Sequence, residues 1–289
     1  VTIDAAGLCI KSGNSVILRG GSESINSNKA LMNCIKKALK DNNINPYMVQ
    51  LIETTDRKAI DKLLSMNSYI DVIIPRGGKG LIEKVMSSSK IPMIKHLDGN
   101  CHVYIDQKAD LDMAFRISIN SKTQRYGVCN AMETLLVHKK FSKKCLKKIL
   151  KTYTESNVEI RGCKNIVKIY TKAKLAKQHD WGQEYLAPII SIKIVDSIDD
   201  AIKHITKYGS LHTDAIISND KESINKFQKL VNSSSVMINT STRFADGFEY
   251  GLGAEIGIST DKLHARGPVG LDGLTNLKYV VTSKGKIRN

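Results

Sequence analysis

The residue best suited to chemistry is Cys129, which lies in a polar turn within residues 121–137. A segment with helical spacing precedes the turn, and the apolar residues 134–137 predict a strand after it. Lys122 and Arg125 lie just upstream. Nearby cations favour the thiolate, which is the reactive form of cysteine. Cys129 is therefore a candidate nucleophile, although most free cysteines are simply small buried apolar residues.

Two glycine-rich junctions between an expected strand and an expected helix could bind an anion. Residues 19–22 (Arg-Gly-Gly-Ser) follow a strand at 15–18, and residues 75–80 (Pro-Arg-Gly-Gly-Lys-Gly) follow a strand at 69–74. Backbone N–H groups at such a junction can hold a phosphate. At the first junction, two glycines alone more often make only a tight turn. The second matches neither the dinucleotide nor the nucleoside triphosphate fingerprint.

Glycine and polar residues also dominate two later segments, 239–257 and 264–268. Arg243 and Arg266 in these segments could direct guanidinium groups toward an anionic ligand. Alternatively, the segment is a long structural crossover whose arginines pair with its own acidic residues.

The elements that must position these residues alternate between strand and helix. Strands are expected at residues 15–18, 48–52, 69–74, 91–95, 102–106, 134–137, 189–195, 214–217 and 235–239. Helices are expected at residues 27–41, 56–66, 81–86, 111–118, 141–153, 197–208 and 221–231. This alternation predicts an α/β fold with a mostly parallel sheet and with ligands at the carboxyl ends of the strands.

The composition narrows the function. The net charge of +16 could attract nucleic acid or an anionic substrate. The lysines are dispersed, and aromatic residues make up only 6% of the chain, so no stacking platform for nucleic acid is expected. The six cysteines form no CxxC pair, which favours neither a zinc site nor a disulfide framework and suits a reducing, cytoplasmic setting. No apolar run approaches the length of a membrane span.

Several motifs together carry a resemblance to a known family. They are residues 126–137 around Cys129 (Tyr-Gly-Val-Cys-Asn-Ala-Met-Glu-Thr-Leu-Leu-Val), 74–80, 241–247, 251–260 and 264–268. Through these motifs the chain resembles the gamma-glutamyl phosphate reductases, or glutamate-5-semialdehyde dehydrogenases, of the aldehyde dehydrogenase superfamily. The resemblance covers essentially all 289 residues.

The resemblance implies three parts. Residues 1–104 would form part of a parallel-sheet cofactor domain, and residues 105–262 would form the catalytic α/β domain. Residues 263–289 would return to the cofactor domain and supply an oligomerisation strand near residues 277–282. In the family, a further segment precedes the position of Val1. The same module also occurs in bifunctional synthases, so a glutamate 5-kinase partner or fused domain is conceivable.

The resemblance also assigns roles. Cys129 would be the nucleophile. The cofactor-binding residues would be Arg19, Gly20, Gly21, Gly77, Gly78, Lys79 and Glu184. The substrate-binding candidates are Asn130, Arg243 and Arg266, and no metal is implied.

The implied reaction is NADPH-dependent reduction of L-glutamyl 5-phosphate to L-glutamate 5-semialdehyde in proline biosynthesis, through a thioester on Cys129, by a cytoplasmic homo-oligomer. Hydrolytic relatives carry a glutamate base where this chain reads His96-Leu-Asp-Gly-Asn. Without that base, water is not activated to attack the thioester, which favours reaction of the thioester with phosphate or hydride. A hydrolytic aldehyde dehydrogenase and a non-catalytic basic binding module remain as alternatives.

Overall fold

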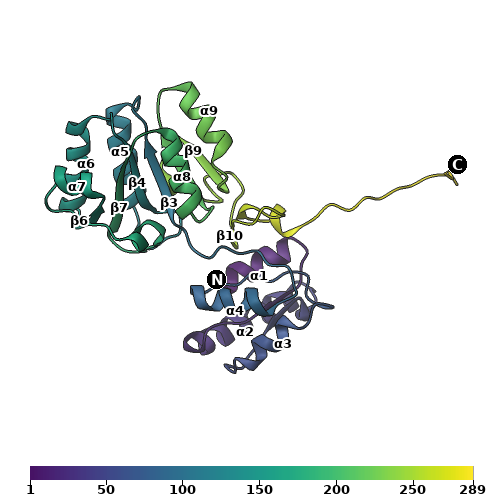
Figure 1. Cartoon of the computed structure of the whole chain (residues 1–289). Coiled ribbons are helices and arrows are strands. Elements are labelled where there is room, and N and C mark those ends of the chain that lie inside the picture. The colour runs from purple at the N-terminus through teal and green to yellow at the C-terminus, as the bar shows by residue number, and fades with distance from the viewer. Residues whose placement is uncertain (289) are drawn as a thin grey trace.

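A seven-stranded parallel sheet forms one of two lobes in the computed structural model, which describes residues 1–288 (Figure 1). Its strand order is β6-β5-β7-β4-β3-β8-β9. The strands are β3 (Cys101–Ile105), β4 (Met132–His138), β5 (Glu159–Gly162), β6 (Lys174–Leu175), β7 (Ile189–Val195), β8 (Thr213–Ile217) and β9 (Ser235–Ile238). The α/β parallel-sheet prediction is confirmed for this lobe.

Five helices cover the two faces of this sheet. They are α5 (Leu111–Thr123), α6 (Lys143–Glu155), α7 (Lys164–Ile169), α8 (Ile198–Tyr208) and α9 (Lys221–Leu230). Four of them begin at a side chain that accepts a hydrogen bond from the first turn: Asp110, Ser142, Ser197 and Asp220. Such caps satisfy backbone N–H groups that have no partner inside the helix.

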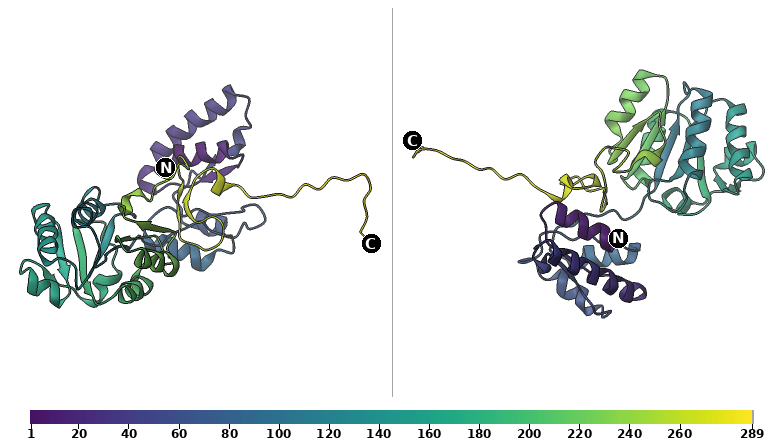
Figure 2. Two further views of the ribbon diagram at one scale, coloured as in Figure 1. Left: turned by 90° about the horizontal axis from the view of Figure 1, so that it is seen from above. Right: turned by 180° about the vertical axis from the view of Figure 1, so that it is seen from behind.

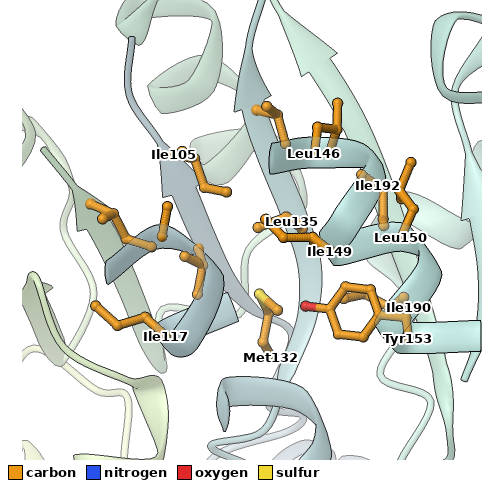
Figure 3. Packing of buried hydrophobic residues seen from close by; sticks show 14 of the residues in the cluster. Ile105, Ile117, Met132, Leu135, Leu146, Ile149, Leu150, Tyr153, Ile190 and Ile192 are labelled. Carbon is orange, nitrogen blue, oxygen red and sulfur yellow. The ribbon is translucent and has the colours of Figure 1, made fainter. Parts of the chain in front are cut away.

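Alternating side chains of the central strands build a core on each face. Val103 and Ile105 of β3 pack in the cluster under α5 and α6, whereas Tyr104 packs in the cluster under α8 and α9. Figure 3 shows the first cluster, in which Ile149 and Tyr153 of α6 face the sheet. Every residue of β3 and β4 is buried, as expected for central strands covered on both sides.

The second lobe contains the N-terminal helices and two small sheets. Its helices are α1 (Thr2–Lys11), α2 (Ile25–Asp41), α3 (Lys58–Leu64) and α4 (Lys79–Ser88). Strands β1 (Val16–Leu18) and β2 (Val49–Leu51) pair in parallel, and β10 (Gly257–Ser259) pairs antiparallel with β11 (Gly267–Val269). A shared apolar cluster joins Leu8 and Ile94 to Ile256 and Val269, so the chain returns to this lobe late in the sequence (Figure 1). In the part of the chain that the structure describes, no helix has both the length and the apolar character needed to cross a membrane.

Two predicted strands, 69–74 and 91–95, are much reduced. Only Ile73 and Met93 form a bridge, through two backbone hydrogen bonds. Pro92 lies inside the second run and has no N–H to donate, and Tyr69 is exposed to solvent. The apolar residues of these runs therefore pack without extending a sheet.

The predicted boundary between residues 104 and 105 falls inside β3, which belongs wholly to the larger sheet. Likewise, β10 lies before residue 263 but packs with the N-terminal lobe. We therefore propose that the division lies in residues 95–100, and that the return to the first lobe begins before Ile256.

The C-terminal segment is the one expected to supply an oligomerisation strand. No strand forms within residues 277–282, and the segment extends away from both lobes (Figure 2). Its large apolar side chains are 78–91% exposed: Leu277, Tyr279, Val280 and Val281.

Candidate active site

Cys129 lies in the turn that leads from α5 into β4, at the amino end of that strand. Gly99 lies just before β3 and Glu184 just before β7, so these residues share the same edge of the sheet. Cys129 precedes its strand, as its sequence position predicts, so the candidate site lies at the amino edge of this sheet rather than at the carboxyl ends of the strands. The reason is topological: a helix-to-strand connection reaches the amino edge of a parallel sheet.

Close backbone packing fixes the turn that carries the thiol. A Cβ atom added to Gly99 would overlap the carbonyl oxygen of Cys129 and lie 2.7 Å from its Cα. The Cys101 Sγ donates to that same carbonyl oxygen at 3.1 Å. The Gly99 N–H donates to Glu184 Oε1 at 2.9 Å. Gly99 therefore joins the thiol turn directly to the proposed cofactor glutamate.

The charges around Cys129 differ from those predicted. Burial raises the pKa of the Cys129 thiol to about 11, and the carboxylates of Glu184 and Glu255 act in the same direction. The Arg76 guanidinium opposes them and lowers this pKa. Lys122, predicted to activate the thiol, is instead fully buried in an ion pair. Arg76 of the second glycine-rich junction, rather than Lys122, is therefore the cation that lowers the pKa of this thiol, although burial and the two carboxylates outweigh it.

Alkylation of Cys129 should report this environment. Because the thiolate is the reactive form and the thiol pKa lies near 11, the rate of iodoacetamide modification should rise about tenfold per pH unit from pH 7 to 10, without a plateau. Arg76→Gln should slow alkylation several-fold at each pH, because it removes the cation that lowers this pKa. Mass spectrometry of the Cys129 peptide measures the rate. A plateau near pH 8 would contradict the environment described here.

The His96–Asn100 stretch contributes no glutamate to the site, as its sequence indicates. The His96 Nδ1 lies 2.9 Å from the carbonyl oxygen of Ile258, and burial lowers the pKa of this histidine. Carboxylates nevertheless reach the thiol from other segments, through Glu184 and Glu255.

Glu184 and Lys79 contact neighbouring residues of the same short segment. The Lys79 Nζ is 3.3 Å from Asp98 Oδ2, next to the Gly99 N–H that bonds Glu184. Lys79 is also the first residue of α4, and Gly78 is the N-cap of that helix. Burial raises the pKa of the Glu184 carboxyl group, and the charge of Lys79 lowers it. The structure thus brings the second junction, the glutamate and the thiol into one site.

A cavity of about 390 Å³ in the N-terminal lobe brings the two glycine-rich junctions together. Its lining includes Arg19, Gly21, Ser22, Arg57, Gly80 and Lys84. The Arg19 Nη2 donates to the carbonyl oxygen of Thr55 at 3.4 Å, while its buried Nε has no partner among the described residues. Gly20 packs beside this wall, against Asn28 of α2. Glu23 also lines the cavity, so three cations face one carboxylate, and this excess of positive charge suits a phosphate-bearing cofactor.

The three substrate-binding candidates occupy different places. Arg243 is half-buried, its Nε donates to Gln124 Oε1 at 2.7 Å, and its charge interacts with that of Cys129. The Asn130 Nδ2 donates to the carbonyl oxygen of Ala245 at 3.0 Å, which holds the long loop, and the Arg266 guanidinium donates to Asn232. Of the three candidates, Arg243 is therefore the one whose charge interacts with the thiol.

Burial and the charge of Arg125 both lower the pKa of Arg243. A half-buried guanidinium group of Arg243 with the exposed Arg125 near it favours a bound anion. This edge of the sheet therefore suits an anionic substrate beside the thiol.

Four residues of this site were not assigned from the sequence: Arg76, Gly99, Cys101 and Glu255. Arg76 lies in a junction that was singled out for its glycines. Gly99 lies in a stretch that was considered only for a missing glutamate. Their roles depend on contacts with Cys129 from distant segments, which no local pattern shows.

Comparisons with known proteins agree with this architecture. The model of the aldehyde dehydrogenase family matches residues 1–165. The crystal structure of gamma-glutamyl phosphate reductase from Thermotoga maritima matches with 43% identity and a TM-score of 0.97, over 100% of this chain and 70% of that one. The enzyme of the same name from Saccharomyces cerevisiae matches with 36% identity and a TM-score of 0.41, over 86% of this chain and 62% of that one.

An engineered glycolyl-CoA reductase with bound NADP⁺ shares the fold, with 17% identity and a TM-score of 0.67, over 91% of this chain and 67% of that one. The family model, which matches more than half of the chain, places it among the aldehyde dehydrogenases. Within that class, the chain belongs to the gamma-glutamyl phosphate reductase family. The family resemblance and the fold class predicted from the sequence are confirmed.

Proposed function

We propose that this chain reduces L-glutamyl 5-phosphate to L-glutamate 5-semialdehyde and phosphate in proline biosynthesis, through a thioester on Cys129. The main support is the match to the Thermotoga maritima reductase, which extends over the whole chain. The site adds a half-exposed thiol, cations that suit an anionic substrate, and a separate cavity that suits a phosphate-bearing cofactor.

The chemistry follows from a thiol placed beside cations. The Cys129 thiol releases its proton to solvent, the thiolate attacks the acyl carbon, the bond from that carbon to the phosphate oxygen breaks, and phosphate leaves with the electron pair. The backbone N–H of Cys129 can stabilise the oxyanion that forms on the acyl oxygen. NADPH supplies the hydride that reduces the resulting thioester. The tetrahedral thiohemiacetal on Cys129 then loses its hydroxyl proton, releases the aldehyde and restores the thiolate.

The residues present fit a nicotinamide dinucleotide. Gly77, Gly78 and Lys79 at the start of α4 would hold the pyrophosphate, where N–H groups of the helix terminus are free. Glu184 would accept hydrogen bonds from the nicotinamide ribose beside Cys129. Arg19 would contact the adenosine ribose with Gly20 and Gly21 at the first junction.

We propose NADPH as the preferred cofactor because the cavity at the first junction is basic. Arg19, Arg57 and Lys84 line it together with Glu23. Because Lys84 already pairs with Asp61 at 2.9 Å, the two arginines are the groups that would bind the roughly two negative charges that a 2′-phosphate adds. The bound NADP⁺ in the engineered glycolyl-CoA reductase is consistent with this choice.

Replacing Arg19 and Arg57 by glutamine should separate the two cofactors. A hydrogen bond to a charged group contributes about 1.5–3 kcal/mol, so each substitution should raise KM for NADPH roughly 10- to 100-fold and leave KM for NADH nearly unchanged. Steady-state kinetics with each cofactor measures this. Arg116→Gln, at an exposed position on α5, is the matched control. Equal effects on NADPH and NADH would contradict a 2′-phosphate site.

The function is tested by NADP⁺ reduction with glutamate 5-semialdehyde, with and without inorganic phosphate. A rise in absorbance only with phosphate is the expected result, because the reverse reaction requires phosphate to attack the thioester. Reduction without phosphate would instead support a hydrolytic aldehyde dehydrogenase, in which Glu184 or Glu255 would activate water. No reduction, together with salt-sensitive RNA binding, would support the basic binding module.

We also propose that the protein is a cytoplasmic homo-oligomer. The exposed apolar side chains of residues 277–281 support this proposal, because a second copy could cover them. A glutamate 5-kinase, separate or fused, would supply the acyl phosphate and is a proposed partner.

A further inference from the structure

A buried ion pair has no part in the chemistry described above. The Lys122 Nζ of α5 lies 2.6 Å from the Glu133 Oε2 of β4, and both side chains are 0% exposed. Removing two charges from water is costly, and apolar replacements for a buried ion pair are often as stable. The pair therefore calls for an explanation other than stability.

The second carboxylate oxygen of Glu133 leads to the active site. Its Oε1 accepts a hydrogen bond from the Leu186 N–H at 3.1 Å. Leu186 has a φ of +52°, in the left-handed region that a leucine seldom adopts, and its side chain is 48% exposed. Side-chain burial therefore contributes little to this conformation, whereas the hydrogen bond to Glu133 directly restrains its backbone.

Leu186 is two residues after Glu184, whose Oε1 accepts the Gly99 N–H at 2.9 Å. Between them, the Tyr185 hydroxyl group contacts Asp180 and Ser191, which anchors the other side of the segment. The charge of Glu184 also acts on Lys122, which places the buried cation close to the proposed ribose-binding carboxylate.

We infer that Lys122 and Glu133 are positioning residues: Lys122 holds the Glu133 carboxylate so that it fixes the Leu186 N–H, and thereby aims Glu184 at the cofactor and Gly99. The inference rests on the proposed function, because Glu184 is taken to bind NADPH. It assigns no contact with substrate or cofactor to the pair itself.

Two double variants isolate the hydrogen bond from the charge. Lys122→Met with Glu133→Gln removes both charges but keeps an amide oxygen that can accept the Leu186 N–H. Lys122→Met with Glu133→Leu removes both charges and also the acceptor. The two variants have similar side-chain volumes at these buried positions. Arg116→Met with Asp112→Leu, at an exposed ion pair on the same helix, is the control.

The leucine variant should raise KM for NADPH about tenfold over the glutamine variant, the effect of one lost hydrogen bond, with KM for the acyl phosphate or aldehyde unchanged. The control should match the wild type. A purely structural role would lower the melting temperature of both variants alike and leave their KM values for NADPH equal. Equal KM values in the two folded variants would overturn the inference.

Hydrogen exchange of the wild-type protein gives a second test that needs no variant to fold and no activity. The Leu186 amide should exchange slowly although its side chain is exposed, because Glu133 accepts its hydrogen bond. Fast exchange at Leu186 would overturn the inference by itself. A wild-type protein that neither binds NADPH nor turns over would instead contradict the proposed function. The exchange rate of the Leu186 amide would then still test whether Glu133 accepts its hydrogen bond.

Discussion

Replacing Cys129 by alanine should abolish phosphate-dependent reduction of NADP⁺. The reaction then lacks the atom that forms the thioester, and we expect kcat/KM to fall on the order of 10⁴-fold or more. Stopped-flow or steady-state absorbance with glutamate 5-semialdehyde and phosphate measures the loss. NADPH binding, followed by fluorescence, should persist because the cofactor cavity lies in the other lobe.

Cys34→Ala is the matched control, since Cys34 is an exposed cysteine on α2. It should retain wild-type turnover. A Cys129→Ser protein with full turnover would exclude the thioester route, because serine cannot form a thioester and its hydroxyl group is a much weaker nucleophile than a thiolate.

Gly99→Ala should reduce activity without removing any reacting group. The added Cβ would overlap the carbonyl oxygen of Cys129 and lie 2.7 Å from its Cα, so the backbone of the nucleophile must move. A displacement of about 1 Å at a reacting atom can cost about 10²-fold in rate, and we expect at least that loss in kcat. Kinetics combined with a thermal melt separates this effect from unfolding.

Gly7→Ala on α1 is the control, because a Cβ there meets no atom within 4 Å. It should leave kcat unchanged and can raise stability slightly, since alanine is a better helix former than glycine. Wild-type kcat in a folded Gly99→Ala protein would show that the thiol turn tolerates displacement.

The central strands could be predicted because their sequences are mostly apolar runs rich in β-branched residues. Residues 134–137 and 189–195 illustrate this, and they lie in β4 and β7. Strand β5 reads Glu-Ile-Arg-Gly and carries no such run, so it was not predicted. It forms because β7 and β6 offer partners on both sides, which is a property of the folded sheet.

The sequence motif proposes Cys129 as the nucleophile, but the surroundings of that thiol could not be predicted from it. Lys122 looks like a free cation beside Cys129 in the sequence, yet Glu133, eleven positions later, buries it in an ion pair. Arg76 is 53 positions from Cys129 in the chain and still acts on its pKa. Both outcomes depend on which segments meet at the sheet edge, and local patterns hold no information about that.

The direction of α5 has a consequence for how the acyl phosphate of the substrate and the phosphates of the cofactor can be bound. The helix connects two parallel strands, so its carboxyl end reaches the amino edge of the sheet, beside Cys129. That end of a helix carries a partial negative charge. The edge therefore repels an acyl phosphate unless side-chain cations offset it, which accounts for Arg125 and Arg243 beside the thiol. In the other lobe, the amino end of α4 faces the glycine-rich junction. At that end, peptide N–H groups would share the proposed pyrophosphate with Lys79, so we expect binding there to depend less on side-chain cations than substrate binding does.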